Sequence, residues 1–299
     1  MRVAVFGATG TIGSALLPLL AGRHDVVAVS RRLHDNNGAT WAVADATDER
    51  AVRRALEGVE VAYYLVHSLG ASNFEERDRQ AARKVARAAE REGLRQLVYL
   101  GGLGDDSPAL SPHLRSRLET AKELAAGSVP VTTLRAAIVV GPGSAGFETI
   151  IALVDRLPAM VCPRWVGVPT QPIALADVVR YLDGVCGEKA AMGESFDVGG
   201  PEVMTYREMI ERIAALRRKR PLIVEIPLLS PRLSSYWLHL VTPVNAATAR
   251  PLIEGLRNAT VAKDERIREL VRIELTPFDE AARVALGLVG SRPRLGPLS

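Results

Sequence analysis

Three glycines near the start of the chain have the spacing of a phosphate-binding loop. The segment Gly7–Gly13 has the sequence GATGTIG and lies between a short apolar run and a stretch with helical periodicity. Glycines let the backbone turn tightly and approach a pyrophosphate, and the helix N-terminus that follows offers free N–H groups. The loop therefore predicts a dinucleotide site, with a plain strand–turn–helix connection as the alternative. The expected contacts are Gly7, Thr9, Gly10, Thr11, Ile12 and Gly13.

The residues after the second apolar run indicate which dinucleotide binds. In dinucleotide-binding α/β proteins an acid at this position takes the ribose hydroxyls of NAD, whereas an arginine accommodates the 2′-phosphate of NADP. Here Arg31 and Arg32 follow the run, and no acid occurs between Gly13 and Asp25. Guanidinium groups bind phosphate as a fork of donors, so we predict NADP (NADPH), with NAD the weaker candidate. A pair of solvated surface arginines is the alternative.

Further candidate contacts follow the third and fourth apolar runs. Ligands of open α/β sheets bind at the carboxyl ends of the strands, where these residues fall. Asp45 is suited to accept a hydrogen bond from the adenine amino group. His67 is suited to a cofactor or substrate role, with a histidine bonded to backbone as the alternative. The expected cofactor contacts are Asp45, Ala46, Leu65, Val66 and His67, and the expected substrate contact is Ser68.

The elements that must position these residues alternate along the first 140 positions. Strands that are apolar on both faces and are separated by helices indicate a parallel sheet covered on both sides. We therefore predict an α/β fold, a Rossmann-type doubly wound parallel sheet. The predicted strands are Val3–Phe6, Val26–Ser30, Trp41–Ala44, Val61–Val66, Leu97–Leu100 and Val131–Val140, and the predicted helices are Ile12–Ala21, Glu49–Leu56, Phe74–Arg91 and Leu114–Ala125.

The pattern loosens after Gly141, and a small C-terminal substrate lobe is expected there. We predict a dinucleotide-binding domain over residues 1–145 with returning elements at about 171–200, and a discontinuous, smaller α/β lobe over 146–290. Residues 291–299 are expected to form a flexible tail. The predicted elements of this half are a helix at Leu175–Val185, a strand at Ser195–Val198, a helix at Tyr206–Leu216 and a strand at Leu222–Ile226.

Composition excludes several functional classes. The chain has 47% hydrophobic and 24% charged residues, as ordinary globular proteins do. Its net charge of +4 is too small to indicate nucleic acid as a partner. Cys162 and Cys186 form no CxxC pair, and HExxH, P-loop and paired-carboxylate motifs are missing, so no metal is expected.

The sequence favours the cytoplasm. The N-terminus lacks the pattern of a secretory signal, and no apolar run approaches the roughly 20 residues of a membrane span. The segment Tyr236–Val244, with the basic run Arg217–Arg220 nearby, is the candidate for contact with a membrane surface. We favour the interpretation that these basic residues form a solvated helix end.

The chain resembles the short-chain dehydrogenase/reductase superfamily in its extended and atypical branch, which includes the NmrA-like proteins. The resemblance covers roughly residues 1–260 and rests first on the glycine loop. It implies a nicotinamide cofactor across the sheet edge and a small lobe that closes on substrate. The supporting segments are Tyr64–Ser68, Val98–Gly102, Pro172–Ile173, Asp177–Val178 and Phe196–Gly200.

The catalytic residues of that superfamily are replaced in this chain. Catalytic members carry a Ser or Thr after the fifth strand and a Tyr-x-x-x-Lys pair on the next helix. By the resemblance, His113 stands at the tyrosine position, Arg117 at the lysine position, and Gly101 and Gly102 in the serine region. Histidine titrates near neutrality and is a competent general acid, whereas Arg117 can hold ribose hydroxyls or stabilise an oxyanion. The candidate catalytic residues are His113, Arg117 and His67, and Gly101 and Arg117 are further cofactor contacts.

These observations predict an NADP-dependent oxidoreductase that transfers hydride to or from a small hydrophobic carbonyl or enone. Phe147, which the resemblance places at the substrate pocket, and the aromatic Trp165 are the other expected substrate contacts. The alternative is a non-catalytic NADP(H)-binding sensor or assembly protein of NmrA-like type, and a sugar-nucleotide epimerase is weaker because it also needs the tyrosine. Monomer and dimer both remain open.

Overall fold

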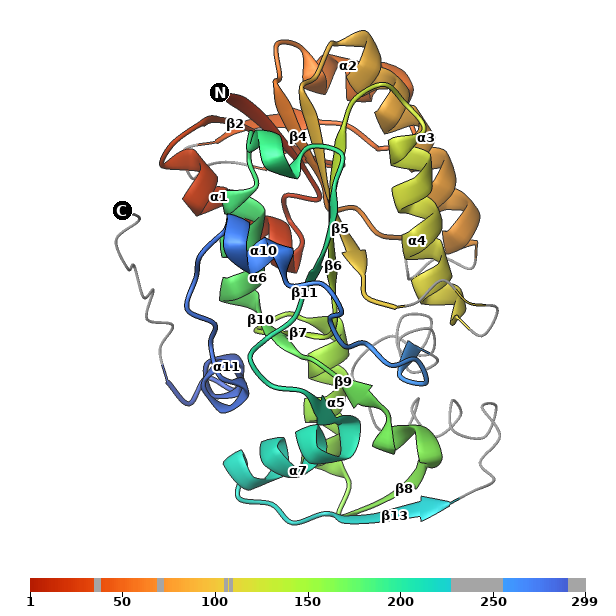
Figure 1. Ribbon diagram of the computed structural model, residues 1–299, viewed down its shortest axis with the longest axis vertical. Coiled ribbons are helices and arrows are strands. Elements are labelled where there is room, and N and C mark those ends of the chain that lie inside the picture. The colour runs from red at the N-terminus through yellow and green to blue at the C-terminus, as the bar shows by residue number, and fades with distance from the viewer. Residues whose placement is uncertain (35–38, 69–72, 105–106, 108–109, 227–254, 290–299) are drawn as a thin grey trace.

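The central sheet of the computed structural model contains seven parallel strands (Figure 1). The structure describes residues 1–34, 39–68, 73–104, 107, 110–226 and 255–289. The strand order is β11-β6-β5-β4-β1-β2-β3, so the predicted doubly wound sheet is confirmed. The strands are β1 (Arg2–Phe6), β2 (Asp25–Ser30), β3 (Thr40–Val43), β4 (Val61–Tyr64), β5 (Gln96–Gly102), β6 (Val131–Ala136) and β11 (Ser195–Val198).

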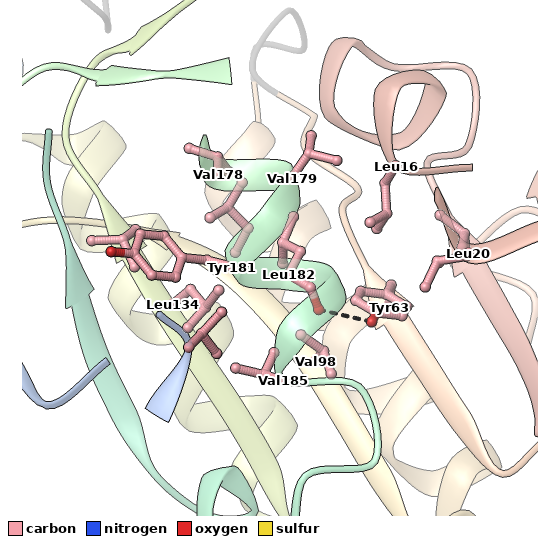
Figure 2. Close-up of a cluster of buried hydrophobic side chains, with 14 of the residues drawn as sticks. Leu16, Leu20, Tyr63, Val98, Leu134, Val178, Val179, Tyr181, Leu182 and Val185 are labelled. Atoms are coloured by element: carbon pink, nitrogen blue, oxygen red, sulfur yellow. Dashed lines mark hydrogen bonds between the residues drawn. The ribbon is translucent and has the colours of Figure 1, made fainter. Parts of the chain in front are cut away.

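Helices cover both faces of this sheet, because alternate residues of each buried strand point to opposite sides. On β4, Tyr63 joins the core under α1 and α6, whereas Tyr64 joins the core under α2, α3 and α4. Figure 2 shows the first of these cores, where the Tyr63 hydroxyl donates to the Leu182 carbonyl oxygen at 2.9 Å. The helices are α1 (Thr11–Ala21), α2 (Glu49–Leu56), α3 (Phe74–Arg91), α4 (Pro112–Ala125) and α6 (Leu175–Gly184).

The order of the strands creates a switch point at β1. The chain runs from β1 outward through β2 and β3, and then returns to place β4 on the other side of β1. Val3 is paired with Val26 on one side and with Val61 on the other. In open parallel sheets, the crevice for a ligand lies at the carboxyl ends of the strands beside such a switch point.

The second half builds a third core below the sheet edge (Figure 1). Its helices pack around Phe147, Met209 and Phe278, while β11 returns to pair with β6. The division into two domains itself stays a prediction. The elements are β7 (Val139–Val140), α5 (Ala145–Arg156), β8 (Ala159–Pro163), β9 (Pro169–Thr170), β10 (Ile173–Ala174), β12 (Met204–Thr205), α7 (Tyr206–Leu216), β13 (Leu222–Ile226), α10 (Arg266–Leu270) and α11 (Phe278–Ala285), with short 3₁₀ turns at Arg164–Gly167 and Lys189–Ala191.

A buried carboxylate joins α6 to the segment that leads into α11. Asp177 is 0% exposed, and its oxygens accept hydrogen bonds from the Thr276 backbone N–H at 2.7 Å and the Thr276 hydroxyl at 3.1 Å. Arg180 forms an ion pair with it at 3.2 Å. A carboxylate taken from water needs such partners, so this contact ties the end of the chain to the sheet domain.

One predicted strand is divided in the structure. The run Val131–Val140 forms β6 and β7, and β7 leaves the large sheet to pair with β10. The predicted segments Tyr236–Val244 and 291–299 lie outside the described residues. Among the described helices, none is long and apolar enough to cross a membrane. Cys162 and Cys186 are both free thiols, and the described residues contain no cluster of three potential metal-binding side chains.

Candidate functional site

The glycine loop between β1 and α1 has a backbone that side chains would disrupt. Gly7 has φ of +82°, and a Cβ atom on it would lie 2.8 Å from the Leu65 carbonyl oxygen. A Cβ atom on Gly13 would collide with the Gly7 carbonyl oxygen. That oxygen also accepts the Gly10 N–H at 2.9 Å, which closes the turn. The loop therefore needs glycine for its left-handed residue and for its close packing on α1.

The N-terminus of α1 is suited to bind an anion. Gly10 is the N-cap and provides no side-chain hydrogen bond, and the first turn of α1 contains no acidic residue. The first N–H groups of a helix lack partners within the helix, and its dipole favours a negative charge there. The Thr11 hydroxyl donates to the Gly143 carbonyl oxygen at 2.6 Å, so the loop is fixed against the segment after β7. These residues fit the diphosphate of an NAD(P) cofactor.

The residues after β2 and β3 bring a positive and a negative group together. Arg31 and Arg32 are exposed at the end of β2. Asp45, at the end of β3, accepts hydrogen bonds from the Thr47 backbone N–H at 2.8 Å and the Thr47 hydroxyl at 2.7 Å. These bonds, with help from Arg77 and Arg31 and against partial burial, lower the pKa of Asp45. Asp45 is therefore ionised, and one of its oxygens already accepts both hydrogen bonds from Thr47. Arg31 is close enough for its charge to stabilise this carboxylate.

A chain of three side chains lies at the carboxyl end of β4, and we refer to Asp78, His67 and His113 as the Asp–His–His chain. Asp78 Oδ2 is 2.8 Å from His67 Nδ1, and His67 Nε2 is 3.3 Å from His113 Nδ1. The other Asp78 oxygen accepts the Ser68 backbone N–H at 3.0 Å. The Ser116 hydroxyl lies 3.4 Å from Asp78 Oδ2. The structure thus brings together two histidines that are 46 positions apart.

Three different elements position this chain. His67 follows β4, Asp78 is in the first half of α3, and His113 is in the first turn of α4. That turn is fixed by the N-cap Ser111, whose hydroxyl accepts the Leu114 N–H at 3.3 Å. The pairing depends on α3 and α4 packing against each other across the same face of the sheet.

The surroundings of both histidines favour the neutral imidazole at pH 7. Burial lowers the pKa of His67, although its hydrogen bond to Asp78 opposes the shift. The pKa of His113 is lowered well below the usual value, first by burial and then by His67 and Arg117. For Asp78, burial acts to raise the pKa, but the bonds from His67 and Ser68 leave it lowered overall. The structure thus places two imidazoles with lowered pKa values beside a buried carboxylate, and the catalytic role of His113 and His67 stays a prediction.

Arg117 lies in the wall of a small pocket between α4, β5 and β6. It donates from Nη2 to the Leu100 carbonyl oxygen, and its guanidinium carbon is 5.0 Å from the centre of the Tyr99 ring. Gly101 also lines this pocket. A Cβ atom on Gly102 would lie 2.8 Å from Leu114 Cδ2, so a serine at this position requires Leu114 to move.

The remaining predicted contacts are distributed between the crevice and the core. Leu65 lies against Gly7, and Ser68 is hydrogen-bonded to Asp78, so both are next to the loop or the Asp–His–His chain. Ala46 is 8% exposed, and Val66 packs on the same core. Phe147 is 0% exposed and meets Phe278 edge-on at 6.3 Å, so the structure shows it as a packing residue. The side chain of Trp165 lies outside the described residues.

Asp78 is the site residue that the sequence reading did not identify. It lies on the buried side of α3 with Ala81, Ala82 and Val85, at helical spacing from them. An acidic residue within the apolar stripe of a helix is the signal that the sequence contained. A buried carboxylate without a partner is costly, so its position alone indicates a partner from another element.

Comparison with protein families supports the interpretation of the crevice beside β1 as a dinucleotide site. Residues 7–140 match the family model described as NAD(P)H-binding. The class that the fold and the loop define is an NAD(P)-binding fold of Rossmann type. The resemblance to atypical short-chain dehydrogenases/reductases agrees with this match and with the shared fold, and stays a prediction. The narrower NmrA-like assignment stays a prediction.

Two solved structures share the fold across nearly the whole chain. Triphenylmethane reductase from Citrobacter sp., complexed with NADP(H), has a TM-score of 0.74 and 16% identity, and the match covers 95% of this chain and 100% of that one. NADPH-dependent quinone oxidoreductase from Escherichia coli, complexed with NADPH, has a TM-score of 0.75 and 22% identity, with 96% and 99% covered. A further structure of this fold holds NAD, so the fold accepts either dinucleotide.

A relative by sequence is a mitochondrial protein of Arabidopsis thaliana, NADH dehydrogenase (ubiquinone) 1 alpha subcomplex subunit 9. It is 24% identical over a match of 240 residues, and the match covers 75% of this chain and 60% of that protein. The chain therefore spans less than two thirds of the length of this relative.

Proposed function

We propose that this protein is an NADP(H)-dependent oxidoreductase in which the Asp–His–His chain handles the proton. The observation that carries this proposal is the position of that chain: His67 lies two residues after Leu65, whose carbonyl oxygen is packed against Gly7 of the glycine loop. A dinucleotide held by the loop extends along the carboxyl edge of the sheet, towards the end of β4. Groups able to bind the cofactor and to exchange a proton thus lie at one edge.

The choice of NADP over NAD rests on Arg31 and Arg32. Both are exposed at the end of β2, the strand whose carboxyl end meets the adenine ribose in this fold. An arginine presents a fork of donors to a phosphate, so the 2′-phosphate of NADP is the favoured ligand. The NADP(H) and NADPH held by the two reductases of the same fold are in keeping with this choice.

The substrate in this proposal is a small hydrophobic carbonyl, enone or alcohol. Bound nicotinamide supplies or accepts the hydride. Residues of this protein bind the dinucleotide, hold the reacting oxygen of the substrate beside His113 and exchange its proton. Arg117, whose guanidinium is fixed on Tyr99 and the Leu100 carbonyl oxygen, provides the positive charge nearest to that oxygen. We propose no nucleic acid partner and a reducing, cytoplasmic setting.

The experiment is a titration of the purified protein with NADPH and with NADH, followed by nicotinamide fluorescence. We expect tighter binding of NADPH. A screen of lipophilic ketones and enones then measures the loss of the reduced-cofactor signal, and at least one compound should be turned over. A protein that binds neither dinucleotide contradicts the whole proposal.

A second function is favoured by a specific observation. The Arabidopsis thaliana relative is described as a subunit of an NADH dehydrogenase, and here the Tyr-x-x-x-Lys pair of catalytic relatives is replaced by His113 and Arg117. An NADP(H)-binding assembly or sensor protein without turnover would have both features. Binding of NADPH together with a complete lack of oxidation by the screened compounds favours this second function.

A further inference from the structure

Asp78 is buried without an ion-pair partner among the described arginines and lysines, and its shortest hydrogen bond is to His67 of the proposed active site. Its side chain is 4% exposed, and it contacts His67, Ser68 and Ser116. Taking a carboxylate out of water costs several kcal/mol unless hydrogen bonds replace the water.

The contacts determine which ring nitrogens carry protons. A carboxylate is only an acceptor, so His67 must donate from Nδ1 to Asp78. A neutral His67 then has a lone pair at Nε2, so the 3.3 Å contact is a donation from His113 Nδ1. A neutral His113 consequently has its own lone pair at Nε2, on the far edge of the ring. The lowered pKa values of both histidines agree with the neutral forms.

We propose that Asp78 is a positioning residue that sets the tautomers of His67 and His113, so that Nε2 of His113 is the atom that accepts the substrate proton. This proposal rests on the proposed function for its catalytic meaning. In the oxidation of an alcohol, the O–H bond breaks and its proton binds Nε2 of His113, while the hydride leaves the carbon for the oxidised nicotinamide. In the reduction, His113 first takes a proton from solvent at Nε2, and that proton then passes to the substrate oxygen as the nicotinamide delivers its hydride to the carbon.

The structure also shows what an amide at position 78 would do. One Asp78 oxygen accepts the Ser68 backbone N–H, which can only donate, so the amide oxygen of Asp78→Asn must occupy that place. The amide NH₂ then faces His67 Nδ1 and donates to it. His67 must carry its proton at Nε2 and donate to His113, which in turn must carry its proton at Nε2. The direction of each hydrogen bond in the Asp–His–His chain is reversed, and Nε2 of His113 can no longer accept a proton.

The direct test is ¹⁵N NMR of the histidine ring nitrogens in the protein without cofactor. For the wild type at pH 7.5, we expect protonated Nδ1 and unprotonated Nε2 in both His67 and His113, assigned with the variants His67→Gln and His113→Gln. For Asp78→Asn we expect the opposite pattern in both rings. Ser116→Ala is the matched control, because it removes the longer 3.4 Å contact to the same carboxylate and leaves the chain intact.

The kinetic test measures alcohol oxidation. Asp78→Asn should lower kcat by about 100- to 10,000-fold, the range of general acid–base catalysis, with KM and NADPH affinity within about threefold of the wild type. Ser116→Ala should retain near-normal kcat. A wild-type His67 protonated at Nε2, or an unchanged tautomer or kcat in Asp78→Asn, overturns the proposal. The wild-type spectrum decides the tautomers of both histidines even if Asp78→Asn does not fold. A wild-type protein without turnover overturns the proposed function and, with it, the role of His113 as proton acceptor.

Discussion

The glycine loop and the Asp–His–His chain lie at the same edge of the sheet, on either side of Leu65, but they are made of different groups. The loop is built of backbone, and it works because Gly7 and Gly13 have no side chains. The Asp–His–His chain is built of side chains from three elements and depends on burial. One edge of the sheet thus provides an exposed anion site and, beside it, a partly buried site where hydrogen bonds fix the positions of protons.

The largest effect should come from the side-chain site. His113→Phe removes the proposed proton acceptor and keeps a planar ring, so turnover should fall by about 100- to 10,000-fold. Cofactor affinity should stay the same, because the glycine loop is untouched. Stopped-flow nicotinamide fluorescence measures both quantities. Undiminished turnover in this variant would remove His113 from the mechanism.

The next effect should come from the backbone site. In Gly13→Val the new side chain collides with the Gly7 carbonyl oxygen, so we expect a loss of stability of about 3 kcal/mol, as for overpacked cores, together with loss of NADPH binding. Urea unfolding and calorimetry are the measurements. Gly22→Ala is the control at the other end of α1, where the added Cβ atom meets nothing closer than 3.6 Å and φ is −68°. Equal behaviour of the two variants would contradict the close packing of the loop.

A smaller effect is expected at the adenine end of the crevice. Arg31→Ala should weaken NADPH binding by about 10- to 100-fold, the value of one or two hydrogen bonds between charged groups, and should leave NADH binding nearly unchanged. Fluorescence titration with both dinucleotides measures the ratio. Equal losses of affinity for NADPH and NADH would show that Arg31 does not bind the 2′-phosphate.

The smallest effect is the pH dependence of stability. Burial lowers the pKa of His113 below 6.5 in the folded state, so the unfolded state binds the proton first as the pH falls. Stability should therefore rise with pH between about pH 5 and 6.5, by at most about 1.4 kcal/mol per pH unit for this group.

The variant His113→Phe separates this contribution from the others. Its stability should rise less steeply with pH than that of the wild type, because His24 and His67, whose pKa values are also lowered, remain in both proteins. Asp78 titrates below this pH range. Urea unfolding at several pH values measures the difference in slope, and identical slopes would mean that His113 is not buried.

The sequence predicted the backbone site better than the side-chain site, for a physical reason. The glycine loop is local: seven consecutive residues, a strand before them and a helix after them determine its geometry. The strands Ser195–Val198 and Leu222–Ile226 and the helix Tyr206–Leu216 were also placed correctly from local periodicity. The split of Val131–Val140 was missed, because β7 is defined by its pairing with β10, more than 30 positions away.

The side-chain site depends on contacts that periodicity cannot supply. His67 and His113 were both singled out by type and position, but nothing local indicates that their rings are 5.1 Å apart. Asp78 was not identified from the sequence, because its partner His67 comes from a different element and only the fold brings the two side chains together. The packing of α3 on α4 had to be known first.

The carboxylate of Asp177 has a practical consequence for anyone who wishes to isolate the nucleotide-binding half. A recombinant fragment that stops before Thr276 deprives this fully buried side chain of the donors at 2.7 and 3.1 Å, leaving Arg180 as its ion-pair partner. Removing the partners of a buried charge typically costs about 3–5 kcal/mol, a large part of the roughly 5–15 kcal/mol by which folded proteins are stable. A fragment that ends at the Rossmann sheet should therefore be less stable than the full protein, and a recombinant protein should extend through α11.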